Sequence, residues 1–156
     1  MARQAGAADA TVGVDVRVLG PHDARVLECV APGVFDGVID PRWSAEFLAN
    51  DRHHLIVAIE DGVVVGMASA MCYVHPDKAP QLWINEVGVA PSHQGRGIGR
   101  QLLDRTMALA AALGCTEAWV LTDRENTVAK RLYERAGGIV PPEDCIMYTI
   151  PVTADP

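Results

Sequence analysis

The sequence predicts a mixed α/β fold in which a single sheet is flanked by about four helices. The clearest evidence is a pair of β-rich runs, residues 54–60 and 63–74, joined by an Asp-Gly dipeptide that is typical of hairpin turns. Two amphipathic runs, 98–113 and 125–136, are each followed by glycine, as at helix C-termini. We therefore expect an α+β sheet that is antiparallel in its first half.

The first third of the chain predicts one strand and two helices. Residues 12–19 alternate valine with polar residues or glycine, which is the pattern of a half-buried strand. Pro21 precedes helical spacing of apolar residues over 22–30 and marks a helix start. Prolines, glycines and aspartates crowd residues 31–41, which predicts a loop, and helical spacing returns over 42–50.

The rest of the chain adds three strands to the predicted sheet. Residues 79–89, 116–122 and 145–152 are each apolar and bounded by turn residues. The helix between the first two of these strands is a crossover, so we expect the two strands to be parallel neighbours. Residues 1–11 are expected to be a flexible lead, and residues 12–156 to form one domain.

Composition excludes several classes of protein. The 156 residues carry a formal net charge of −7, whereas a nucleic-acid-binding domain usually has a basic surface. No apolar run is long enough for a membrane span, and the five histidines lack metal-ligand spacing. The four cysteines are scattered and the N-terminus lacks an apolar signal segment, so we expect a cytoplasmic protein with reduced thiols. The sequence leaves open whether it is a monomer or a homodimer.

Three glycines, Gly95, Gly97 and Gly99, lie between an apolar strand and a helix. Glycines let a backbone turn sharply and approach a ligand, and a helix N-terminus offers free N–H donors to an anion. The stretch does not match G-x-G-x-x-G, because Arg100 stands at the last glycine position, and no P-loop string occurs. We interpret it as a seat for phosphate; the alternative is a glycine-rich turn with no ligand.

The stretch VGVAPSHQGRGIGRQLL resembles the acetyl-CoA-binding motif of the GCN5-related N-acetyltransferases (GNAT), and TDRENTVAKRLYERAGG is similar to the next helix of that family. The resemblance implies the GNAT fold, acetyl-CoA as cosubstrate, and direct transfer of the acetyl group in a ternary complex. It implies that backbone N–H groups bind the pyrophosphate, that a strand edge pairs with pantetheine, and that an asparagine binds pantetheine or caps its helix. The implied CoA-binding residues are Val87, Gly88, Val89, Gln94, Gly95, Arg96, Gly97, Ile98, Gly99, Arg100 and Asn126.

Two residues are candidates for proton transfer. An alkyl ammonium has a pKa near 10, so an acceptor amine must lose a proton before it attacks a thioester. Glu86, at the centre of its strand, can accept that proton; alternatively it only binds the ammonium. Tyr133 matches the position of the tyrosine that the family uses as general acid toward the leaving thiolate; the alternative is a packing role.

The candidate substrate loop is residues 34–40. Phe35 can stack on a substrate, and Asp36, Asp40 and Glu86 can attract a cation, which the acidic net charge also favours. Features of this loop, the hairpin and the C-terminus resemble the aminoglycoside 3-N-acetyltransferase branch, which implies a small polycationic amine as substrate. The alternatives are a protein or peptide N-acetyltransferase and a non-catalytic acyl-CoA-binding module; the latter would be expected to lack Glu86 and Tyr133.

Overall fold

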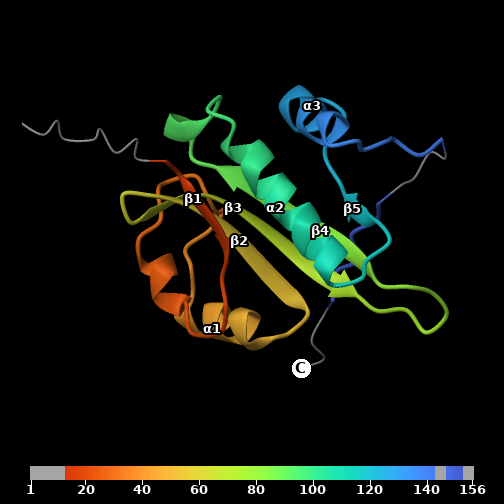
Figure 1. Ribbon diagram of the computed structural model, residues 1–156, viewed down its shortest axis with the longest axis horizontal. Coiled ribbons are helices and arrows are strands. Elements are labelled where there is room, and N and C mark those ends of the chain that lie inside the picture. The colour runs from red at the N-terminus through yellow and green to blue at the C-terminus, as the bar shows by residue number, and fades with distance from the viewer. Residues whose placement is uncertain (1–12, 143–146, 153–156) are drawn as a thin grey trace, which may run out of the picture.

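The computed structural model describes residues 13–142 and 147–152, and its elements follow the predicted order up to the last helix (Figure 1). The predicted N-terminal lead, residues 1–11, lies outside the described residues. The elements are β1 (Asp15–Val18), the 3₁₀ helix η1 (Ala24–Glu28), α1 (Pro41–Ala49), β2 (His53–Glu60), β3 (Val63–Tyr73), β4 (Gln81–Val89), the 3₁₀ helix η2 (Pro91–His93), α2 (Ile98–Ala112), β5 (Ala118–Val120) and α3 (Thr127–Arg135).

The five strands form one mixed sheet in the order β1-β2-β3-β4-β5. Strands β1 to β4 pair antiparallel, and β5 pairs parallel to β4. The turn between β2 and β3 holds Asp61 and Gly62 at positive φ, as an Asp-Gly hairpin turn requires. The predicted hairpin and the predicted parallel crossover are both confirmed.

The two faces of the sheet pack against different helices. Alternate residues of β2 point to opposite faces, so Leu55 and Val57 join one core cluster with Leu48 of α1, while Ile56 and Ala58 join a second with Leu102 of α2. Figure 1 shows α2 lying across the sheet with α3 beside its N-terminal half. We call the two sides the α1 face and the α2 face.

The prediction of an α-helix over 22–30 is wrong, because residues 24–28 form only a short 3₁₀ helix. Its N-cap residue, Asp23, makes no capping bond, because its carboxylate accepts from the N–H of Gly20 instead. The following residues leave the helix to meet the sheet, where Val30 forms a parallel bridge with Val64. Pairing with the sheet edge therefore competes with continuation of the helix.

The final strand predicted over 145–152 is also not observed. Residues 145 and 146 lie outside the described residues, and 147–152 are described but belong to no strand. Their apolar side chains, including Tyr148 and Ile150, are exposed, and a strand needs a partner edge that these residues do not meet. Within residues 13–142 and 147–152, no helix combines the length and the apolar character needed to cross a membrane.

Candidate functional site

The site is centred on a β-bulge in β4. Ser69 of β3 pairs with Glu86, whereas the next residue, Ala70, pairs with Ile84, so Asn85 is an extra residue on β4. On the other side, β5 pairs with β4 only as far as Ile84. Beyond the bulge, residues 86–89 keep β3 on one side and pair with no described strand on the other. This leaves a free strand edge next to Glu86.

Gly88 lets the candidate substrate loop lie directly on β4. A Cβ atom at Gly88 would collide with the backbone carbonyl of Val34. Any other residue here would push the loop off the strand, because the obstacle is backbone rather than a flexible side chain. The glycine that the sequence assigned to CoA binding thus has a packing role as well.

The Glu86 side chain lies on the α1 face, half-buried. Residues directly opposite each other in an antiparallel pair point to the same face, so Glu86 shares the face of Ser69. Ser69 lies two residues after Met67 on β3, and Met67 belongs to the α1-face cluster, so both point to that face. Burial raises the pKa of Glu86, and the nearby carboxylate of Asp36 raises it further. The structure therefore brings Glu86 and Asp36 together as a pair of carboxylates, which a cation would stabilise.

Ser69 adds a polar group that the sequence did not single out. Its hydroxyl is buried and has no hydrogen-bond partner among the described residues. Ser69 lies opposite Glu86 only through the register of β3 and β4, so its place in the site could not be predicted from the sequence. No group of three or more His, Cys, Asp or Glu in the described part of the chain could hold a metal ion.

The glycine turn presents free backbone donors at the start of α2. Gly95 and Gly97 have φ of +75° and +80°, and the space where their side chains would project is open. Gly97 is the N-cap of α2. The N–H groups of residues 98–100 donate to no described carbonyl, as expected for a first helical turn. Such an arrangement suits an anion, because the donors and the helix dipole both point toward it.

Side chains of the turn hold it in place. Arg96 forms a two-pronged ion pair with Glu60 at the end of β2, with one Nη1–Oε2 distance of 3.0 Å, and His93 Nε2 lies 2.9 Å from the same carboxylate. Hydrogen bonding from Arg96 lowers the pKa of Glu60 to about 2. Gln94 donates to the carbonyl of Val89. The roles of Glu60 and His93 were missed, because they depend on a contact between residues far apart in sequence.

Helix α3 is fixed to the start of α2. Gly99 faces Leu132 of α3, and a Cβ there would lie 3.5 Å from that side chain, an ordinary van der Waals contact, so this packing does not itself require glycine. Arg100 donates to the carbonyl of Arg135, at the end of α3. Asn126 is the N-cap of α3 and accepts from the N–H of Ala129 at 3.0 Å, so the capping alternative is observed. Its contact with pantetheine stays a prediction.

Ile98 can contact a ligand only through its backbone, whereas Tyr133 has a side-chain donor. The Ile98 side chain is buried in the core, so only its N–H can serve the site. Tyr133 is half-buried and packs against the same α2-face cluster as Val87 of β4. Burial raises the pKa of Tyr133, which keeps the phenol protonated at neutral pH. Tyr133 and Glu86 therefore lie on opposite faces of the sheet.

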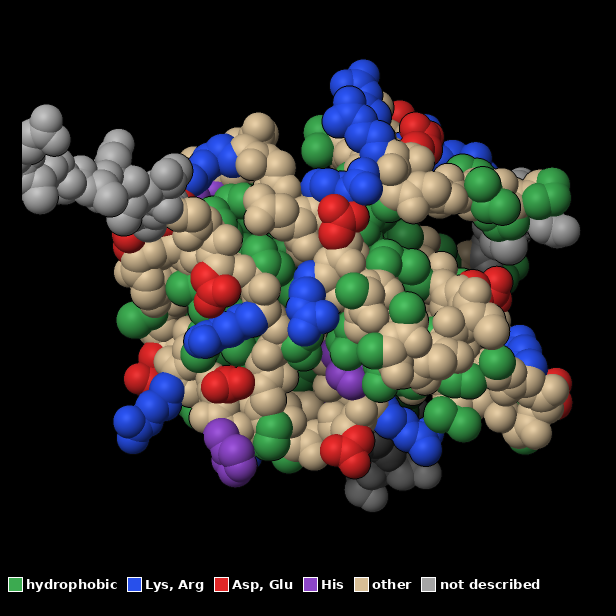
Figure 2. All heavy atoms as spheres, viewed as in Figure 1, with side chains coloured by type: hydrophobic (Ala, Val, Ile, Leu, Met, Phe, Trp, Pro, Cys, Tyr) green, Lys and Arg blue, Asp and Glu red, His purple; other side chains and the backbone are tan. Residues whose placement is uncertain are grey.

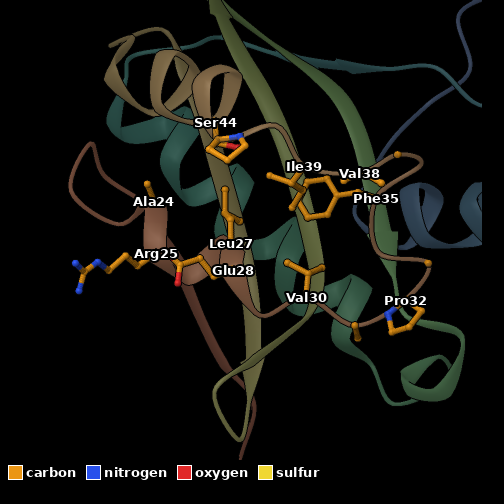
Figure 3. A pocket seen from close by; sticks show the side chains of 14 residues that line it. Ala24, Arg25, Leu27, Glu28, Val30, Pro32, Phe35, Val38, Ile39 and Ser44 are labelled. Atoms are coloured by element: carbon orange, nitrogen blue, oxygen red, sulfur yellow. The ribbon is translucent and has the colours of Figure 1, made fainter.

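Two predicted substrate residues have structural roles. Asp40 is the N-cap of α1: its Oδ1 accepts from Arg42 N–H at 2.7 Å and, more weakly, from Trp43 N–H. Phe35 lines an apolar pocket of about 610 Å³ between η1, the loop and α1 (Figure 3), which neither Asp36 nor Glu86 lines. This pocket and the carboxylate pair are therefore lined by different residues, and the substrate contacts of Phe35 and Asp40 stay predictions.

Charged side chains occur on both sides of the sheet near this site. On the side that carries α2, acidic and basic side chains are intermixed, with apolar groups between them (Figure 2). On the α1 face, Asp36 and Glu86 are close enough for their charges to interact. This pair therefore offers a cation two carboxylates close together.

Comparison with known proteins relates this geometry to a family. The family model described as "Acetyltransferase (GNAT) family" matches residues 27–138. The chain is 30% identical over 96 residues to aminoglycoside N(6')-acetyltransferase type 1 of Salmonella typhimurium, an alignment that covers 59% of this chain and 66% of the relative, just under two thirds of its length.

Solved structures share the fold of this chain. An aminoglycoside acetyltransferase from an uncultured soil metagenomic sample, in complex with sisomicin, superposes with a TM-score of 0.75 at 16% identity, covering 90% of this chain and 97% of that one. AAC(6')-Iy in complex with the bisubstrate analogue CoA-S-monomethyl-acetylneamine has a TM-score of 0.69 at 25% identity, covering 89% and 99%. The aminoglycoside relative compared above acts at the 6' position, whereas the sequence features resembled the 3-N branch.

Proposed function

Because this chain belongs to the acetyltransferase (GNAT) family, we propose that it transfers an acetyl group from acetyl-CoA to a primary amine of a small polycationic substrate such as an aminoglycoside. The observation that carries the proposal is the carboxylate pair Glu86 and Asp36, which lies beside a free strand edge and near a glycine turn with free N–H groups. We take residues 12–156 to be one catalytic domain that acts in the cytoplasm.

The chain offers two backbone surfaces that suit CoA. The N–H groups of residues 95–100 would bind the pyrophosphate at the N-terminus of α2. The free edge of residues 87–89 would pair with the pantetheine amides, as an added strand pairs with a sheet edge. The Asn126 side chain, whose oxygen caps α3, has an amide N–H₂ left to donate to the same arm. Acetyl-CoA supplies an activated acyl group at the gap between β4 and β5.

The two candidate proton-transfer residues act from opposite faces of the sheet. Glu86, on the α1 face, takes a proton from the substrate ammonium, either directly or through water, and the free nitrogen then attacks the thioester carbonyl. As the C–S bond breaks, Tyr133 on the α2 face donates its phenolic proton to the leaving sulfur. The attacking nitrogen releases its second proton to solvent, and solvent returns a proton to the Tyr133 phenolate. The products are an N-acetyl amine and CoA with a free thiol. Direct transfer of this kind needs no acyl-cysteine intermediate.

The acidic pair favours a substrate with several positive charges. Two close carboxylates can each meet a separate ammonium group, and unpaired they repel one another. The similarity of the chain to aminoglycoside acetyltransferases supports this choice. A thiol-release assay with acetyl-CoA tests the proposal directly, with aminoglycosides, simple alkylamines and peptides as acceptors. Release with peptides but with no aminoglycoside would overturn the substrate assignment.

We predict that Asp36→Asn raises the KM for an aminoglycoside several-fold and leaves acetyl-CoA affinity unchanged. The substitution removes one charge of the pair that meets the substrate. Asp51→Asn is the matched control, because it removes the same charge from an exposed turn that contains none of the candidate site residues. The wild-type KM should also rise with added salt, since exposed charges are screened beyond about 8 Å at physiological ionic strength. Equal effects of the two substitutions would count against a specific role for Asp36.

We predict that Tyr133→Phe lowers kcat by about 10²-fold, within the usual range for loss of a general acid. Phenylalanine keeps the packing against the α2-face cluster and removes only the donor. The measurement is the pH profile of kcat from neutral to alkaline conditions, together with thermal unfolding to verify the fold. A variant with full activity across that range would reduce Tyr133 to a packing residue.

A further inference from the structure

A second cavity of about 420 Å³ lies at the start of β4 and contains an aromatic cluster. Trp83 of β4 and Trp119 of β5 are register partners, and their rings pack edge to face with centroids 6.4 Å apart. Tyr73, at the end of β3, also lines the cavity. Trp119 and Tyr73 are about half exposed, at 47% and 52%. We call this the aromatic pocket; the reaction as described above makes no use of it.

The aromatic pocket opens on the same face of the sheet as Glu86. Met71 of β3 pairs with Trp83 and lies two residues after Ser69, so Met71 and Ser69 share a face. Ser69 in turn shares its face with Glu86. Because Asn85 is an extra residue in the bulge, β3 gives the spacing: Met71 and Ser69, which pair with Trp83 and Glu86, are two residues apart, roughly 7 Å at the usual rise per residue. A ligand of that length could reach both.

A chain of hydrogen bonds places a negative charge at the edge of this pocket. His75 Nε2 donates to Gln81 Oε1 at 2.8 Å, and Gln81 Nε2 donates to the Glu117 carboxylate. Gln81 is more than nine-tenths buried, so its amide is held in place and orients both partners. The pocket therefore combines exposed indole and phenol faces with a fixed carboxylate.

These groups match the chemistry of an organic ammonium ion. The faces of tryptophan and tyrosine attract cations through the ring quadrupole, most strongly for tryptophan, and a carboxylate adds to this attraction. An uncharged apolar ligand would gain nothing from Glu117. Among the described residues that line the pocket there is no lysine or arginine, so none of them brings a fixed cation to the rings.

We propose that the aromatic pocket binds a second ammonium group of the acceptor, roughly 7 Å along the strand from the nitrogen that is acetylated. The inference rests on the proposed function and narrows it: the preferred acceptor is a diamine or polyamine whose charged groups span that distance. A monoamine, or a peptide that has only its N-terminus charged, would leave this pocket without a ligand.

The test compares straight-chain diamines of increasing length with monoamines of the same length, in the thiol-release assay. We expect the KM of the diamines to fall below that of the matched monoamines as the spacing approaches roughly 7 Å. Trp119→Leu should remove this advantage, raising the diamine KM about 3- to 30-fold with little effect on the monoamine KM. Trp119→Phe should retain part of it, and Trp43→Leu, an exposed tryptophan on α1, should retain all of it.

Binding without turnover gives an independent measurement. Titration of the protein with a diamine of the preferred length should change tryptophan fluorescence in the wild type, and the change should shrink in Trp119→Phe. Equal KM values for diamines and monoamines in the wild type, or an unchanged ratio in Trp119→Leu, would overturn the inference while the proposed function stands.

Other outcomes separate the two proposals further. Absence of thiol release with every amine would instead reject the proposed function. If Trp119→Leu converts a dimer to a monomer in analytical ultracentrifugation and leaves the KM ratio unchanged, the pocket is a contact between copies of this chain and the inference is wrong.

Discussion

Replacement of Glu86 by glutamine should lower kcat about 10²- to 10⁴-fold at neutral pH, the range for loss of a positioned general base. Glutamine has nearly the same size as glutamate, so the bulge at Asn85 and the packing of the substrate loop should survive. Acetyl-CoA affinity, measured by calorimetry, should hardly change, because the backbone of residues 87–89 and 95–100 accounts for the proposed CoA contacts.

The pH profile gives this prediction a second readout. A general base works only when it is deprotonated, and burial together with Asp36 raises the pKa of Glu86. Activity should therefore fall as the pH is lowered through that raised pKa, at a higher pH than an exposed glutamate would give. Asp36→Asn removes the second cause of the shift, so it should move the acidic limb of the kcat/KM profile to lower pH.

The control for Glu86→Gln is Glu46→Gln, which removes the same charge from an exposed position on α1. This control should leave kcat and its pH profile unchanged. A Glu86→Gln variant with wild-type kcat would show that the carboxylate is not the base. If only the KM of the amine rose, Glu86 would be a binding group for the ammonium.

Local patterns predicted the parts of the fold that depend on neighbouring residues. The Asp61-Gly62 turn pairs its flanking strands because those two residues accept positive φ. The two-faced helix from Ile98 forms because its apolar residues recur at helical spacing. The position of the glycine turn before this helix was also predicted, because the tolerance of glycine for positive φ is a local property that does not depend on distant contacts.

Contacts between distant segments could not be predicted in this way. The 3₁₀ helix near residue 25 ends early because Val30 meets Val64, more than thirty residues further along the chain. The contact of Gly88 with Val34 and the ion pair of Arg96 with Glu60 each join segments that are far apart in the sequence. Both depend on the tertiary fold rather than on neighbouring residues.

The bulge at Asn85 has no signal in the sequence, because it arises from the mismatch between two paired strands. The aromatic pocket could not be predicted from the sequence either. Its two tryptophans lie on different strands, and only the register of β4 and β5 places them side by side. The candidate base was therefore predictable as a residue, whereas most of its surroundings were not.

Gly97→Val should weaken acetyl-CoA binding about 5- to 150-fold. Gly97 has φ of +80°, a conformation that costs a β-branched residue about 1–3 kcal/mol. Without ligand, the valine variant can relax its turn away from that conformation. Binding then requires the strained turn to re-form, and the strain appears as lost affinity, with each 1.4 kcal/mol worth a factor of ten.

The control that isolates this effect is Gly114→Val, at the opposite end of α2. Gly114 also has positive φ, +74°, and open space beyond its Cα, so valine meets the same backbone strain without a steric clash. Both variants should lose some stability in urea unfolding, but only Gly97→Val should lose affinity in calorimetric titration with acetyl-CoA. Since the two substitutions differ only in which end of the helix they disturb, equal affinities would mean that the N–H groups at the start of α2 do not bind the cosubstrate. The same result would leave the glycine turn without a ligand, which is the alternative the sequence itself allowed.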